Sequence, residues 1–285
     1  MPKTHLPAED DSPSGLLERT LAVMELLSAN AQGMQLADIA DGLRIPRSAT
    51  HRVLTSLVER GYVRQERRHG GYQLTAKIAT LAFNFLAGMG GADLAQSILD
   101  RLARETGELV RLAIVDGERL ICVAKSQGPQ FGLRYDPEMG QVARLSCSAS
   151  GIAWLSCLPE AEALALVEKQ GYGARAEYGP KAPRTPQAFL KYLRAARKNG
   201  YALTVQTYAE RMNTIAAPVR DAFGQEAIGA VNISGPHMRL TEARMRELAP
   251  RVLEAARELS VAMVSTSPAG VRRSGPRDDD LAPTP

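Results

Sequence analysis

A short turn between two amphipathic segments constrains the fold of this chain more than any other feature of its sequence. The turn spans residues 42–46. The segment before it carries apolar residues at helical spacing, namely Leu36, Ile39, Ala40 and Leu43. The segment after it is predicted to be a helix over residues 47–60, because proline (Pro46) is favoured at helix starts and glycine (Gly61) at helix ends. Two short helices joined by so tight a turn are typical of a helix-turn-helix unit.

Flanking segments complete this unit. Upstream, Ser14 is expected to cap a helix whose apolar stripe comprises Leu17, Leu21, Met24 and Leu27. Downstream, two short strands joined through His69-Gly70-Gly71 predict a β-hairpin. Residues 1–13 are polar and contain proline, which predicts a flexible arm. We therefore expect a winged helix-turn-helix domain over residues 14–75.

The positive charge of the chain is concentrated in this domain. Residues 44–71 contain seven arginines and two glutamates, a net charge of +5. The whole chain carries only +4, so the remaining residues together carry −1. A run of charged residues is most often a solvated face. Here, however, it lies on the predicted helix over residues 47–60 and on the tip of the predicted hairpin.

These two elements predict contact with double-stranded DNA. A helix with its side chains is about 10–12 Å across and fits a major groove about 12 Å wide. Arginine pairs bidentately with guanine, and serine or threonine contacts bases or phosphates. The candidates on the helix are Arg47, Ser48, Thr50, His51 and Arg52, and those at the hairpin tip are Arg67 and Arg68. The alternative is a helix that only packs in a core, with Ala49, Val53, Leu54, Leu57 and Val58 facing inward.

The sequence pattern after the first domain divides into three segments. Residues 76–91 predict a linker helix that pairs subunits, or alternatively an ordinary core helix. Residues 92–266 mix period-two strands with capped helices, so we expect an α+β chain whose second domain has an antiparallel sheet. The segment from 267 to 285 is rich in proline and charge and is expected to be disordered.

Several classes of protein are disfavoured. No apolar run approaches the about 18 residues that a membrane helix needs, and the start of the chain does not look like a signal peptide. Three cysteines without regular spacing favour the cytoplasm, and scattered histidines give no metal site. No phosphate-binding loop, dinucleotide fingerprint or nucleophile elbow is present, so no cofactor is expected. An enzyme with Cys147 or Ser148 as nucleophile needs a base, and the only histidine after residue 69 is His237.

Several motifs, in order, resemble the IclR family of bacterial transcription regulators over about residues 15–265. In the first domain they are ERTLAVMELL, LADIADGLRIPRSATHRVLTSLVERGYV and YQLT. In the second they are ETGELVRLAIVDG, CSASGIAWLSCLP, NGYAL, IAAPVRDAFGQ and GAVNISGP. The resemblance implies a homodimer or dimer of dimers that binds an operator, and a GAF-like second domain that binds a small carboxylic or aromatic acid.

The resemblance also implies where that effector binds. The implied pocket comprises Leu145, Cys147, Ser148, Ala149, Ser150, Met212, Thr214, Asn232 and Ser234. Residues 148–150 precede a helix, so free backbone amides would favour an anion, although Ser150 is equally explained as a helix cap. The chain departs from the family pattern at Ala49 and at residues 206–211, where carboxylates are replaced and Arg211 is added. Arg134 and Arg144 flank the pocket segment, with either a binding or a surface role.

A ligand-responsive, DNA-binding regulator is therefore the leading hypothesis. A DNA-associated scaffold that binds no metabolite is the second, and the Cys147 or Ser148 enzyme is the third. The sequence does not specify the operator or the effector. It also leaves open whether the protein represses or activates transcription and whether it is a dimer or a tetramer.

Overall fold

The computed structural model describes residues 13–66, 70–88, 92–128, 139–221 and 223–264 of the chain. It divides into two compact units, residues 1–88 and residues 89–285. Among the described residues, no helix is both long and apolar enough to cross a membrane. The predicted arm (1–13) and tail (267–285) lie almost entirely outside the described residues, as do Arg67, Arg68, His69 and Arg134.

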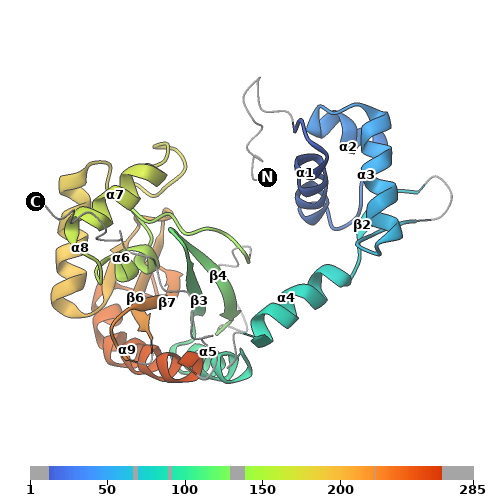
Figure 1. Ribbon diagram of the computed structural model, residues 1–285. Coiled ribbons are helices and arrows are strands. Elements are labelled where there is room, and N and C mark those ends of the chain that lie inside the picture. Colours follow the sequence, from blue (N-terminus) through green and yellow to red (C-terminus); the bar gives the residue numbers. More distant parts are fainter. Residues whose placement is uncertain (1–12, 67–69, 89–91, 129–138, 222, 265–285) are drawn as a thin grey trace, which may run out of the picture. The chain divides into compact units, whose positions relative to one another are not determined.

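The first unit is a three-helix bundle followed by a hairpin and a fourth helix (Figure 1). Its elements are α1 (Leu16–Ser28), α2 (Leu36–Leu43), α3 (Arg47–Glu59), β1 (Val63–Gln65), β2 (Tyr72–Leu74) and α4 (Lys77–Gly88). The strands pair antiparallel with Val63 opposite Leu74. The small core contains Val23, Leu27, Ile39, Val53, Leu54 and Leu57. The predicted helix-turn-helix, hairpin and following helix are confirmed.

The turn between α2 and α3 depends on one left-handed residue. Arg44 has φ 54° and ψ 38° and ends α2, and the Ile45 amide donates to the Ala40 carbonyl at 3.0 Å. The left-handed residue reverses the chain direction within a few residues, as at many helix ends. Ile45 is then buried in the core, which anchors the turn.

Helix α1 differs from its prediction in two ways. Its N-cap is Gly15 rather than Ser14, and the Glu18 carboxylate accepts the backbone amides of both residues. Leu17 and Leu21 are 71% and 50% exposed, and the neighbouring Leu16 is also exposed. The buried residues of α1, Val23 and Leu27, both lie in its second half.

The second unit is a five-stranded antiparallel sheet with helices on both faces (Figure 1). The strands are β3 (Leu109–Asp116), β4 (Arg119–Ser126), β5 (Ala202–Val205), β6 (Met212–Arg220) and β7 (Ala227–Pro236), in the order β4-β3-β7-β6-β5. The helices are α5 (Ala92–Thr106), α6 (Ala149–Leu155), α7 (Glu160–Gln170), α8 (Pro186–Asn199) and α9 (Glu242–Val264). The predicted antiparallel sheet is confirmed.

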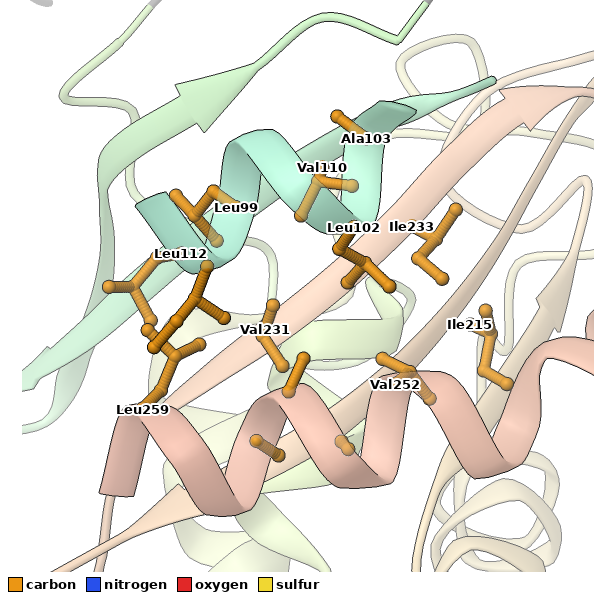
Figure 2. Packing of buried hydrophobic residues seen from close by; sticks show 14 of the residues in the cluster. Leu99, Leu102, Ala103, Val110, Leu112, Ile215, Val231, Ile233, Val252 and Leu259 are labelled. Carbon is orange, nitrogen blue, oxygen red and sulfur yellow. The ribbon is translucent and has the colours of Figure 1, made fainter. Parts of the chain in front are cut away.

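Each face of the sheet has its own core. On one face, α5 and α9 pack through Leu99, Leu102, Val252 and Leu259 against Val231 and other strand residues (Figure 2). On the other face, α6 packs on β6 and β7, and α8 packs on α6 and on the edge strand β5. Alternating side chains along a strand point to opposite faces, which explains the two separate clusters. The second face also carries the polar residues described below.

Two helices of this unit have well-defined ends. The Thr185 hydroxyl accepts the Ala188 amide at the start of α8, and Gly200 ends this helix with φ 77°. The Thr241 hydroxyl accepts the Arg244 amide at the start of α9. Residues 139–147 form no strand and contain only an isolated bridge between Val142 and Ile121.

Candidate functional site

The exposed face of α3 brings together four of the predicted DNA-contacting residues. Arg47, Ser48, His51 and Arg52 are all exposed, and they lie one turn apart on the side of α3 away from the core. Arg47 is 67% exposed and lies 3.9 Å from the Asp41 carboxylate, a weak surface pair. The guanidinium groups of this face are therefore available to a partner.

Thr50 is not on this face, so its placement among the DNA-contacting residues is corrected. Its side chain is fully buried, and its hydroxyl donates to the Pro46 carbonyl at 3.2 Å. Thr50 stands three and four residues before Val53 and Leu54, which are core residues, so helical periodicity turns it inward. The converse error is Val58, which was expected to be buried and is 39% exposed.

Replacing Thr50 by valine is expected to leave operator affinity within about twofold of wild type, because Thr50 is fully buried and valine presents no new group to DNA. The lost hydroxyl contact lowers the free energy of unfolding by about 1 kcal/mol. Fluorescence anisotropy with operator DNA and urea unfolding followed by circular dichroism measure the two effects. A large loss of operator affinity in a folded Thr50→Val protein would contradict the buried position.

In the second unit, four of the predicted effector residues form one hydrogen-bonded chain. Thr214 Oγ1 lies 3.0 Å from Ser234 Oγ, which donates to Asn232 Oδ1 at 3.0 Å. Asn232 Nδ2 donates to Ser150 Oγ at 2.8 Å. Thr214 and Ser234 are cross-strand partners on β6 and β7, and Ser150 comes from α6 above the sheet. The chain is largely buried and fixes the orientation of the Asn232 amide.

The start of α6 holds this arrangement through close backbone packing. Ser148 is the N-cap, and its hydroxyl accepts the Gly151 amide at 3.1 Å, so the cap is Ser148 rather than Ser150. A Cβ at Gly151 would lie 2.8 Å from the Leu145 Cα, which only glycine avoids. The Ser148 hydroxyl is thus engaged by the backbone, and the predicted anion at this helix start has no support from it.

A small pocket opens beside the hydrogen-bonded chain. Its lining includes three of the predicted residues, Ser148, Ser150 and Asn232. It also includes Arg111, Cys122 and Tyr208, which sequence reasoning missed. Arg111 on β3 is the register partner of Asn232 on β7, so both side chains lie on the same face of the sheet. The pocket therefore combines a cation, hydroxyl and amide groups, and apolar walls.

The remaining predicted residues do not line this pocket. Leu145 and Ala149 belong to the core under α6, and the Cys147 carbonyl accepts the Thr207 hydroxyl at 2.6 Å. Met212 is half-buried at the start of β6. None of these four is among the lining residues.

Arg144 and Arg211, whose roles the sequence left open, differ in what their side chains contact. Arg144 donates to the Tyr178 hydroxyl at 2.9 Å and to the Gln170 carbonyl at 2.7 Å, so it ties down the loop after α7. Arg211 has φ 60° in the turn before β6, and its side chain is exposed near Glu210. Arg211 is thus a surface residue, and the family departure at residues 206–211 leaves only Tyr208 in the pocket lining.

The Cys147 thiol is expected to stay unmodified in the native protein at pH 8. Burial raises its pKa to about 12, against a smaller lowering by Arg144. Since only the thiolate reacts, mass spectrometry after brief exposure to iodoacetamide should find Cys147 alkylated only in denaturant. The native state keeps this proton while the unfolded state loses it above pH about 8.5, so the raised pKa also lowers stability as pH rises from there towards 12. Native labelling of Cys147 as fast as that of the half-buried Cys157 would contradict this environment.

Comparison with known proteins agrees with both units. Residues 84–261 match the family model described as bacterial transcriptional regulator IclR C-terminal, and residues 16–67 match the IclR helix-turn-helix domain. The HTH-type transcriptional regulator BhcR of Paracoccus denitrificans is 29% identical over 267 residues, covering 94% of each chain.

Solved structures support the same fold. A transcriptional regulator from Rhodococcus sp. RHA1 has a TM-score of 0.75 and 24% identity, covering 88% of this chain and 99% of that one. An IclR homologue from Microbacterium hydrocarbonoxydans, solved with 4-hydroxybenzoate, has a TM-score of 0.72 and 19% identity, covering 87% and 99%. The relatives found by sequence are regulators, which gives no support to an enzyme built on Cys147 or Ser148. This chain belongs to the IclR family of bacterial transcriptional regulators, which carry a helix-turn-helix DNA-binding domain.

Proposed function

We propose that the protein binds an operator through the exposed face of α3 and that a small organic acid in the second unit modulates this binding. The observation that carries the effector assignment is the pocket in which Arg111 and the Asn232 amide lie on one sheet face beside apolar walls. A carboxylate pairs well with a guanidinium, and the hydroxyl and amide groups orient the rest of the ligand.

The related structure from Microbacterium hydrocarbonoxydans contains 4-hydroxybenzoate, which supports an aromatic or other carboxylic acid as the class of ligand. Thr214 and Ser234 would orient Asn232 toward it, whereas Ser150 lines the pocket itself. The effector changes operator affinity only through its different affinity for two conformations of the protein. A tenfold change in operator affinity needs about 1.4 kcal/mol of coupling.

We further propose that the protein acts as a homodimer or a dimer of dimers in the cytoplasm. Leu16, Leu17 and Leu21 form an exposed apolar stripe on α1, and Leu81 of α4 is also exposed. A second copy that covered these leucines would remove them from water. Two copies of α3 would then read two half-sites, spaced by the symmetry of the dimer. The three free cysteines, at positions 122, 147 and 157, are compatible with a reducing compartment.

Arg111→Gln tests the effector pocket. The full-length protein is titrated with DNA from its own upstream region, with and without 4-hydroxybenzoate, benzoate or pyruvate. We expect at least one acid to change operator affinity and to raise the melting temperature of the wild type. Arg111→Gln should bind the operator without acid but lose the change in operator affinity. Arg119→Gln, an exposed arginine on the adjacent strand, is the matched control. If no acid changes operator affinity or melting temperature, the scaffold without a metabolite is the better hypothesis.

A further inference from the structure

A second cleft in the effector unit lies apart from the pocket beside Asn232. It has a volume of about 280 Å³ and shares no lining residue with that pocket. Its walls come from the end of β6, from α8 and α9, and from the segment after α6. The side chains that define it are Cys157, Arg197, Pro218, Arg220, Leu253 and Arg257. No Asp or Glu is among its lining residues, so the cleft carries positive charge.

Two of the three arginines in this cleft have guanidinium N–H groups that are available to donate to a ligand. Arg257 is exposed on α9 and makes no hydrogen bond or ion pair with any part of the chain that the structure describes. Arg220 donates from Nη2 only to the Cys157 sulfur at 3.2 Å, a weak acceptor. Its Nη1 contacts the Gly224 and Gln225 carbonyls at long distances of 3.3 and 3.4 Å. Arg197 differs, because its Nε donates to the Ser156 carbonyl and its Nη1 lies 3.7 Å from Glu160.

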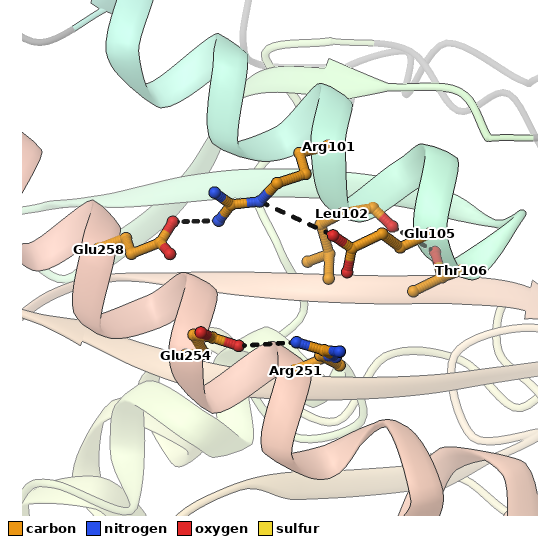
Figure 3. A network of polar contacts seen from close by, with 7 residues as sticks. All are labelled: Arg101, Leu102, Glu105, Thr106, Arg251, Glu254 and Glu258. Carbon is orange, nitrogen blue, oxygen red and sulfur yellow. Dashed lines mark hydrogen bonds and ion pairs between the residues drawn. The ribbon is translucent and has the colours of Figure 1, made fainter.

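The acidic side chains of α9 do not neutralise this cleft. Glu254 pairs with Arg251 at 3.2 Å, and Glu258 pairs with Arg101 of α5 (Figure 3). Leu253, Ala256, Arg257 and Ser260 are spaced three and four residues apart on α9 and line the cleft, whereas these glutamates belong to the neighbouring face toward α5. Among the described residues, no carboxylate pairs with Arg257.

Cys157 supplies no negative charge either. Burial raises the pKa of its thiol, and this effect is larger than the lowering by Arg220 and Arg197. A neutral thiol leaves the Arg220 charge uncompensated. Pro218 and Leu253 add apolar surface beside the two guanidinium groups.

We propose that this cleft is a second ligand site, which binds a small organic anion with its carboxylate or phosphate on Arg220 and Arg257 and its apolar part against Pro218 and Leu253. Guanidinium groups bind either head group through charge-assisted hydrogen bonds. The volume holds a ligand of a few carbon atoms plus the head group. This site does not depend on the function proposed for the first pocket.

Cys157 offers a local measure of occupancy. Full-length protein is treated with iodoacetamide at increasing concentrations of phenyl phosphate or benzoate, and alkylation of Cys157 is followed by mass spectrometry. The two arms share the phenyl group and differ in the head group, so they separate phosphate from carboxylate recognition. Isothermal titration calorimetry with the same two compounds measures binding directly.

We expect saturable protection of Cys157 by at least one compound, with a matching calorimetric Kd. Arg257→Gln should weaken that binding by at least about tenfold, since a charge-assisted hydrogen bond is lost. Arg251→Gln is the matched control, because it removes an arginine from the same helix outside the cleft. Arg111→Gln should remove the operator response but leave Cys157 protection intact, which separates the two sites.

The proposal is overturned if neither compound gives protection or heat that depends on Arg257. It is also overturned if Arg257→Gln and Arg251→Gln weaken binding equally. If Cys157 reacts too slowly to follow, the calorimetric comparison of the two variants decides alone. Arg257 is exposed, so its replacement does not threaten folding.

Discussion

Replacing both Arg47 and Arg52 by glutamine is expected to abolish sequence-specific operator binding. Both side chains are exposed on the outer face of α3, where they can reach base edges and phosphates. A bidentate contact between arginine and guanine contributes about 1–3 kcal/mol of discrimination, so the two losses together, about 2–6 kcal/mol, predict at least about thirtyfold weaker binding. Fluorescence anisotropy with the genuine upstream fragment, competed by a scrambled oligonucleotide at fixed moderate salt, measures the loss of preference.

The control for this variant removes the same charge elsewhere. Arg244→Gln with Arg251→Gln takes two arginines from α9, where each is paired with a glutamate on the surface. We expect this control to retain its preference for the genuine fragment. If the Arg47 and Arg52 variant also retains that preference, the assignment of α3 as the reading helix is wrong.

Local sequence signals were sufficient for the first unit because its contacts are mostly local. Pro46, Gly61 and the apolar spacing around residues 47–60 predicted α3 to within a residue. Thr50 was misplaced because its polarity was given more weight than its spacing. Its position three residues before Val53 already indicated the core, and the structure buries it there. For a short amphipathic helix, periodicity is the stronger signal.

The pocket depends on strand register, which local sequence does not reveal. Thr214, Asn232 and Ser234 were expected in one site, and the structure joins them with Ser150. Arg111 was missed because it lies 121 residues from its partner Asn232 and meets it only through the pairing of β3 with β7. A signal was present, however. An arginine within the apolar run from Leu109 to Val115 is unusual for a buried strand and indicates a functional face.

The exposure of Leu17 and Leu21 shows another limit of prediction from local sequence. An apolar stripe predicts that residues leave water, but it does not say whether the same chain or a second copy covers them. Val23 and Leu27 are the residues of α1 that are buried in the core of the first unit. The stripe predicted correctly that α1 is amphipathic, and the described residues of the bundle leave the first half of that face exposed.

Replacing Arg239 by methionine is expected to lower the free energy of unfolding of the second unit by about 3 kcal/mol. Arg239 donates from Nε and Nη2 to the two oxygens of the Glu108 carboxylate, each at 2.8 Å. The Glu108 side chain is only 6% exposed, so the variant leaves a buried charge without this partner. Urea unfolding followed through the single tryptophan, Trp154, which is buried in the same unit, measures the change.

A double variant tests whether the loss of stability comes from the lost attraction between Arg239 and Glu108 or from the unpaired charge left on Glu108. Glu108→Leu combined with Arg239→Met removes both charges, and we expect it to be more stable than Arg239→Met alone, because no uncompensated carboxylate remains. Arg251→Met is the matched control. Its pair with Glu254 is exposed on both sides, so its loss should change stability by less than about 1 kcal/mol. If Arg239→Met and Arg251→Met have equal effects, burial of Glu108 contributes nothing to the stability of this unit, and the ion pair at the start of β3 behaves as a surface contact.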